Sequence, residues 1–78
     1  MNDERVYEEK ADFVANELAA MVRRATRGVV SALGYERQGA YEYVVVETPT
    51  VLFDVNVTAD SLWAIAKDVM RAVGERFE

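Results

Sequence analysis

The stretch YEYVVVETPTVLFDVNV, which spans residues 41–57, decides the fold. Its two ends, Tyr41–Glu47 and Val51–Val57, are rich in Val, Tyr and Phe, which favour strands over helices. Between them, Thr48-Pro49-Thr50 predicts a turn, because proline cannot donate a hydrogen bond to the interior of a sheet. The stretch therefore predicts two antiparallel strands joined as a hairpin.

Side chains alternate between the two faces of a strand, so the hairpin has one apolar face and one mixed face. The apolar face is expected to form the core, with Phe53 largely buried; it consists of Val44, Val46, Val51, Phe53, Val55 and Val57. The mixed face consists of Tyr41, Tyr43, Val45, Glu47, Leu52, Asp54 and Asn56. Glu42 lies on the other side of the pleat from Glu47 and Asp54.

Apolar residues three or four positions apart predict a long first helix before the hairpin. It is expected over Asp3–Leu33, either continuous or kinked at Gly28, with Asn2 as its N-cap. Gly34 follows the last periodic residue and is expected to end the helix. A polar connection, Glu36–Ala40, then leads into the hairpin.

A second helix is expected after the hairpin, capped by Thr58 and with Asp60 in its first turn. Its buried stripe is formed by Leu62, Ile65, Ala66, Val69, Val73 and Phe77. The predicted order is helix–strand–strand–helix. We therefore expect a single α+β domain over residues 1–78, in which two helices cover one face of a two-stranded antiparallel hairpin.

The composition argues against an enzyme. The chain has 78 residues, a net charge of −5, no His and no Cys, so the commonest general base and all thiolate chemistry are missing. It contains no calcium-binding loop, no glycine-rich phosphate loop and no nucleophile elbow. The only carboxylates on the strands, Glu42, Glu47 and Asp54, are divided between two faces. We expect no catalytic residues, no metal and no cofactor.

The sequence also bears on localisation. No stretch approaches 18 uninterrupted apolar residues, the length that a membrane helix needs. The first residues, Met1-Asn2-Asp3-Glu4, are acidic where a signal peptide is basic. We therefore expect a cytoplasmic protein with no membrane partner.

The clearest functional signal is an acidic surface with exposed aromatic residues. Residues 41–60 hold four carboxylates and no Lys or Arg. Such a surface can engage a basic groove on another protein, and tyrosines are common in recognition surfaces. The predicted partner-binding residues are Glu42, Glu47, Asp54, Asp60, Tyr41, Tyr43 and Leu52.

A basic cluster, formed by Arg23, Arg24 and Arg27, lies within the predicted first helix. These arginines can complement the negative end of the helix dipole or contact phosphates. Because the whole chain is acidic, its long-range attraction to a polyanion is poor. Direct nucleic-acid binding is therefore not the expected function.

In its small size, acidity, lack of Cys and His, and layout of two helices and one hairpin, the chain resembles inhibitor proteins of phages and mobile elements. The anti-CRISPR proteins are the best-known group. The residues that carry the resemblance are Glu42, Glu47, Asp54, Asp60, the carboxylates from Asp3 to Glu17, and the Tyr41/Tyr43 face. The resemblance implies stoichiometric binding to a Cas protein, as a DNA mimic that blocks a DNA-binding surface.

The sequence leaves three candidate functions for the protein. The first is a non-enzymatic inhibitor or adaptor that binds a nucleic-acid-handling protein through its acidic surface. The second is an antitoxin-like homodimeric structural or regulatory module that self-associates through Tyr41, Tyr43, Val45 and Leu52. The third is a small nucleic-acid binder that uses the arginine cluster.

Overall fold

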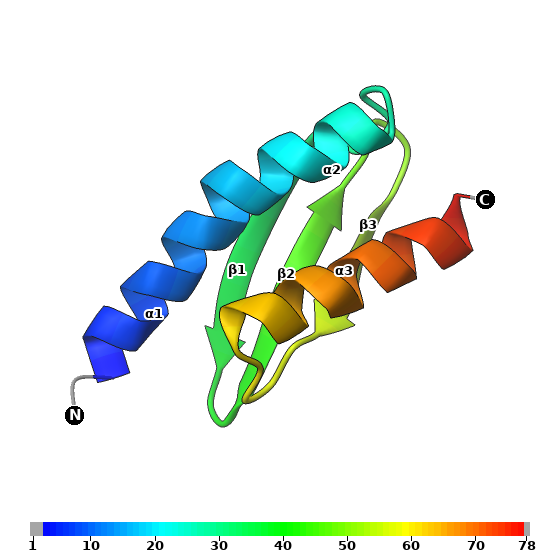
Figure 1. Ribbon diagram of the computed structural model, residues 1–78. Helices are drawn as coiled ribbons and strands as arrows, with labels where there is room; N and C mark the ends of the chain where they lie inside the picture. Colours follow the sequence, from blue (N-terminus) through cyan, green and yellow to red (C-terminus); the bar gives the residue numbers. More distant parts are fainter. Residues whose placement is uncertain (1–2, 78) are drawn as a thin grey trace.

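The computed structural model describes residues 3–77, and its two helical segments lie on the same face of an antiparallel sheet (Figure 1). The elements are α1 (Asp3–Asp12), η1 (Phe13–Leu18), α2 (Ala19–Ala25), β1 (Ala32–Gln38), β2 (Tyr41–Glu47), β3 (Leu52–Asn56) and α3 (Leu62–Arg76). The predicted α+β class is confirmed. Within residues 3–77, no helix is long and apolar enough to cross a membrane. The N-cap predicted at Asn2 lies outside the described residues.

The first helical segment runs without a break through α1, η1 and α2. Its middle part, η1, is a π-helical stretch. Val14, Leu18 and Val22 recur every four residues and are fully buried against the sheet. The segment lies along β1, and its N-terminal turns extend beyond the sheet (Figure 1).

The first helix ends at Ala25, so the predicted extension to Leu33 and the kink at Gly28 are wrong. The N–H of Gly28 donates to the carbonyl of Arg23 at 2.9 Å, and the N–H of Arg27 donates to that of Arg24 at 3.2 Å. This is the Schellman pattern of a helix end, with Arg27 in the left-handed conformation at φ 54°. Gly28, at φ 86°, continues the reversal into β1.

The chain after this turn forms β1, so the sheet has three strands in the order β1-β2-β3. Gly34 lies inside β1, where it pairs with Val45, and does not end a helix. The predicted connection Glu36–Ala40 is wrong except for its last two residues, because residues 36–38 pair with β2. A short apolar run does not distinguish a strand from a helix by spacing alone, which explains the first error, and residues 36–38 were read as a connection because they are polar.

The second hairpin matches the sequence prediction. β2 and β3 pair antiparallel, and Pro49 lies in the connection between them. Thr48 stabilises this connection, since its hydroxyl donates to the carbonyl of Val51 and accepts from the N–H of Val51, both at 2.9 Å. Strand propensity and turn chemistry agree here.

α3 begins later than predicted. Its N-cap is Ser61, whose hydroxyl accepts from the N–H of Ala64 at 3.2 Å. The hydroxyl of Thr58, the predicted cap, instead accepts from the N–H of Glu42 at 3.0 Å. Asp60 precedes the helix, because the chain first turns at Ala59, which has φ 62°. The loop therefore binds β2 before the helix starts.

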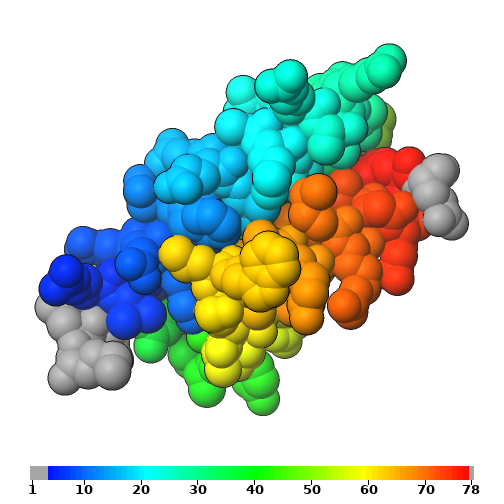
Figure 2. Space-filling view, viewed as in Figure 1, coloured from blue at the N-terminus to red at the C-terminus, as the bar shows by residue number. Residues whose placement is uncertain are grey.

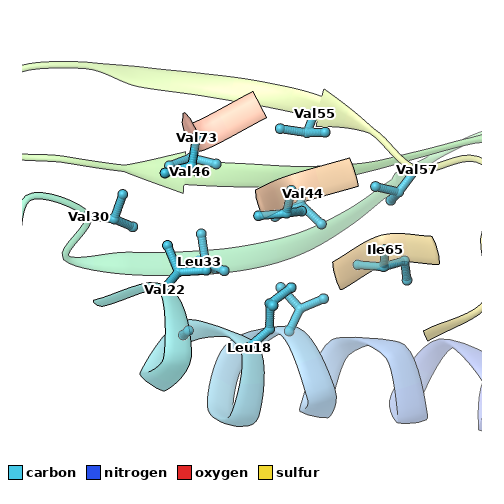
Figure 3. Packing of buried hydrophobic residues seen from close by; sticks show 13 residues of the cluster. Leu18, Val22, Val30, Leu33, Val44, Val46, Val55, Val57, Ile65 and Val73 are labelled. Carbon is cyan, nitrogen blue, oxygen red and sulfur yellow. The ribbon is translucent and has the colours of Figure 1, made fainter. Parts of the chain in front are cut away.

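The core lies between the helices and the sheet (Figure 3). Its fully buried side chains come from every layer and include Leu18, Val22, Val30, Val44, Val46, Val57, Ile65 and Val69. Five predicted core residues are less buried than expected, and three of these, Val51, Leu62 and Ala66, are half-buried. Phe77 lies beyond the end of α3 and is exposed. Phe53 is only half-buried because β3 is an outer strand; the Arg76 guanidinium lies 4.5 Å from its ring centre.

Candidate functional site: the open face of the sheet

Both helical segments cover one face of the sheet and leave the other face, which we call the open face, without a helix (Figure 1). The register of the three strands and the alternation of side chains define its members. They are Ala32, Gly34, Glu36, Gln38, Tyr41, Tyr43, Val45, Glu47, Leu52, Asp54 and Asn56.

Tyr41, Tyr43 and Val45 form an apolar strip along the central strand β2, which ends at Glu47. Glu36 on β1 and Asp54 on β3 lie on either side of this strip. Reading across β1, β2 and β3, the neighbours are Glu36–Tyr43–Asn56, Gly34–Val45–Asp54 and Ala32–Glu47–Leu52. Tyr41 and Leu52 are 58% and 64% exposed. Glu47 and Asp54 are diagonal neighbours, at a typical Cα separation of about 7–8 Å. The arrangement is an apolar strip with acidic edges.

No open-face position is Lys or Arg. Glu36 accepts a hydrogen bond from Gln38 at 3.2 Å, and the Glu47 and Asp54 side chains are exposed. A hollow of about 420 Å³ adjoins the open face at Glu47 and Leu52, beside the connection between β2 and β3. The open face suits contact with a basic protein surface, where tyrosine and leucine add apolar area.

Glu36 was not among the predicted partner-binding residues, because the segment that forms β1 was expected to be helix and connection. The signal lies in the residues before the first turn. Gly39 and Ala40 directly precede the strand that starts at Tyr41, and two-residue connections containing glycine are typical of hairpins. Reading backwards from that turn pairs Gln38 with Tyr41 and Glu36 with Tyr43, as the structure does.

Glu42, one of the predicted partner-binding residues, lies on the helix-covered side. Its Oε1 atom accepts from the Lys10 ammonium at 2.7 Å and from the Tyr35 hydroxyl at 2.5 Å, and its Oε2 accepts from the N–H of Ala59 at 3.0 Å. Burial by itself raises the pKa of Glu42, but these three donors outweigh burial and lower it to about 2. Burial, and then the bond to Glu42, raise the pKa of Tyr35.

Asp60 also lies apart from the open face, in the loop before α3. Burial, followed by the contact with Asp68, raises the pKa of Asp60 to about 6. Its Oδ2 atom is buried and finds no hydrogen-bond donor among the described residues. A proton on Asp60 lets its carboxyl group share a hydrogen bond with Asp68.

The structure thus divides the predicted partner-binding set. Tyr41, Tyr43, Glu47, Leu52 and Asp54 share the open face, and Glu42 and Asp60 do not. The arginine cluster is exposed at the end of α2 and in the turn after it, in the helical layer. Two separate surfaces of opposite charge result.

Comparisons of the chain with known proteins give no relative from which a site could be transferred. Searches against protein-family models, curated proteins and solved structures find no match. Within residues 3–77, no three acidic side chains gather in a way that could hold a metal ion. The functional argument therefore rests on the chemistry of the surfaces.

Proposed function

We propose that the protein is a non-enzymatic inhibitor or adaptor that binds a basic, nucleic-acid-binding surface of another protein through its open face. The observation that supports this proposal is the chemistry of that face. Glu36 and Asp54 lie on the two sides of the apolar strip on β2, and Glu47 lies at its end. Tyr41 in the strip and Leu52 beside Glu47 are exposed, and no open-face position is Lys or Arg. The carboxylates select a basic partner, and the apolar strip supplies contact area.

The partner class follows from charge complementarity. Proteins that handle DNA or RNA contact phosphates with Lys and Arg, so their binding surfaces are basic. A carboxylate-bearing sheet competes with nucleic acid for such a surface, as a DNA mimic does. Cas proteins are the first partners to test, because the chain resembles anti-CRISPR inhibitors of phages in size and charge. The proposal places the protein in the cytoplasm.

The homodimer is the weaker alternative. The Tyr41/Tyr43 face offers apolar area for self-association, as the sequence suggested. However, two open faces brought together would gather Glu36, Glu47 and Asp54 of both copies in one interface without any open-face Lys or Arg. Like charges at an interface cost several kcal/mol. This repulsion disfavours a dimer through the open face, whereas a basic partner relieves it.

The test is competition for DNA. A labelled target duplex is bound to a purified Cas protein–guide RNA complex, and the protein is added while fluorescence anisotropy is recorded. We expect stoichiometric displacement of the duplex that weakens as salt rises, because exposed charges are screened over about 10 Å at 0.1 M ionic strength. Glu47→Lys with Asp54→Lys should weaken the competition at least 100-fold.

The matched control reverses two charges in the helical layer, Glu8→Lys with Glu17→Lys. Both residues are exposed on the first helical segment, so net charge changes by the same amount as in the open-face variant. We expect this control to compete within about threefold of wild type. Equal losses in both variants would show that net charge, and not the open face, drives binding. Sedimentation of both variants reports any change in self-association.

A further inference from the structure

A groove of about 400 Å³ lies in the helical layer, between the end of α2 with its following turn and the C-terminal half of α3. Its position is between the cyan and the orange-to-red segments of Figure 2. Thr26, Arg27 and Val29 line one wall. Met70, Gly74 and Phe77 are on the other, at helical spacings of four and three residues.

The groove gathers apolar side chains that the core leaves exposed. Val29 is 45% exposed, and Met70 and Phe77 are exposed as well. Met21, 47% exposed, precedes the groove residue Ala25 by one helical turn on the same side of α2. Methionine is flexible and adapts to different apolar partners. The groove therefore offers an apolar floor between α3 and the end of α2 with its following turn.

Two groove residues are locally unfavourable for the fold. Arg27 holds the left-handed position of the helix end, with φ 54°, where glycine is favoured. Gly74 lies in α3, where alanine would be more stable. Among the described residues, no neighbouring atom lies within 4 Å of where its Cβ would stand. Residues that are unfavourable for their local backbone conformation, and that have no structural reason to be there, are typical of functional sites.

Cations lie in and beside the groove. Arg27 lines it, and residues 19–31 contain no acidic residue. On α3, Lys67 precedes Met70 by three residues and Arg71 precedes Gly74 by three, so both lie beside the groove-lining stripe. An apolar floor with a basic rim complements a segment that has an apolar side and acidic flanks.

We propose that this groove binds an acidic amphipathic helix of a protein partner. The apolar side of that helix lies against Val29, Met70 and Phe77, its backbone approaches α3 at Gly74, and its carboxylates face Arg27. Helix-in-groove binding uses apolar anchors one helical turn apart. The apolar floor and the acidity of the whole chain favour this occupant over nucleic acid. This second surface is separate from the open face and does not depend on its function.

The test uses a labelled helical peptide of 18 residues that has Leu at i, i+3, i+4 and i+7 and Glu at most other positions. A matched peptide carries Lys in place of every Glu. Anisotropy with the full chain should show saturable binding of the Glu peptide, and binding of the Lys peptide should be at least tenfold weaker. A labelled DNA duplex serves as the third probe and should bind more weakly than the Glu peptide.

Two variants separate binding from folding. Gly74→Leu fills the open space beside α3, and Arg27→Gly relieves the left-handed arginine and removes its charge. Each should raise the melting temperature and weaken Glu-peptide binding at least tenfold. The controls are Ala20→Leu, which adds apolar bulk at an exposed helical position outside the groove, and Arg37→Gln, which removes a charge from β1. Both should bind within twofold of wild type.

Several results would overturn the proposal. They are the absence of Glu-peptide binding at 100 μM protein, equal binding of the two peptides, or unchanged binding by both Gly74→Leu and Arg27→Gly. Tighter binding of the duplex, lost in Arg27→Gly, would assign the groove to nucleic acid instead. A variant that binds more weakly but melts at a lower temperature would show that the residue serves the fold.

Discussion

The two faces of one sheet differ in almost every property, although the same strands build both. On β2, Val44 and Val46 are fully buried against the helices, and the alternate residues Tyr41 and Glu47 are exposed on the open face. The covered face holds the fold together by apolar contact. The open face contributes little burial and is free to carry binding chemistry. Because side chains alternate between the two faces, neighbouring residues of a single strand serve either stability or recognition.

Carboxylates also have different surroundings on the two faces. On the covered side, Glu42 connects three parts of the chain through Lys10, Tyr35 and Ala59. A carboxylate in such a position is stable because each oxygen has a donor. On the open face, Glu47 and Asp54 are exposed. Acidic residues are therefore structural on one face and available to a partner on the other.

The largest expected contrast comes from removing a leucine on each side of the sheet. Leu18→Ala empties a fully buried site and should lower the free energy of unfolding by about 2–5 kcal/mol. Leu52→Ala, at an exposed position, should change it by no more than about 0.5 kcal/mol. Urea unfolding of both variants measures the difference. Equal losses would mean that the open face is covered in solution.

A second contrast concerns the two classes of carboxylate. Glu42→Gln should lower the free energy of unfolding by about 1–3 kcal/mol, because Lys10 loses its ion-pair partner and Tyr35 its charged acceptor. Glu47→Gln is the matched change on the open face and should be nearly neutral. The comparison fails if Glu42→Gln unfolds at the same urea concentration as wild type.

A smaller effect concerns pH. Asp60 has a pKa raised to about 6, so its contribution to stability is present below about 3.8 and is lost as pH rises to 6. Glu42 has a pKa lowered to about 2, so its contribution is present above about 4.5 and is lost as pH falls. These two groups together predict greatest stability near pH 4.

Asp60→Asn tests the upper part of this profile. It removes the group whose pKa is raised to about 6. The melting temperature of the variant should therefore change less between pH 4 and pH 7 than that of wild type. Glu42→Gln should instead make the fall in melting temperature below pH 4.5 less steep than in wild type. An unchanged profile in Asp60→Asn would show that the carboxyl pair formed with Asp68 does not control stability in this range.

The hairpin was predictable from sequence because strand propensity, alternation and the Pro49 turn all favour the same structure. Its face assignment, including the placement of Tyr41 and Leu52 away from the core, is confirmed by the register. β1 was missed because the run after Gly28 fits a helix as well as a strand. The local signal, a left-handed arginine at position 27, is not one that sequence rules anticipate.

Local sequence rules could not predict which acidic residues share the open face, and the reason is a different one. Glu42 is structural only because Lys10, 32 positions earlier, reaches it. Asp60 is separated from the open face by a turn at Ala59 that follows from its contact with β2. Long-range partners of this kind carry no periodic pattern. Charge counts along the chain therefore grouped residues that the fold places on different sides.

The most direct test of the open face places an uncharged obstacle beside Val45, the residue at its centre. Gly34 faces Val45, and among the described residues no atom lies within 4 Å of where its Cβ would stand, so Gly34→Trp should leave folding and net charge intact. The measurement is DNA displacement from the Cas protein–guide RNA complex. The account predicts a wild-type melting temperature with competition weakened at least tenfold. Unchanged competition by this folded variant would contradict the assignment of the open face as the binding surface.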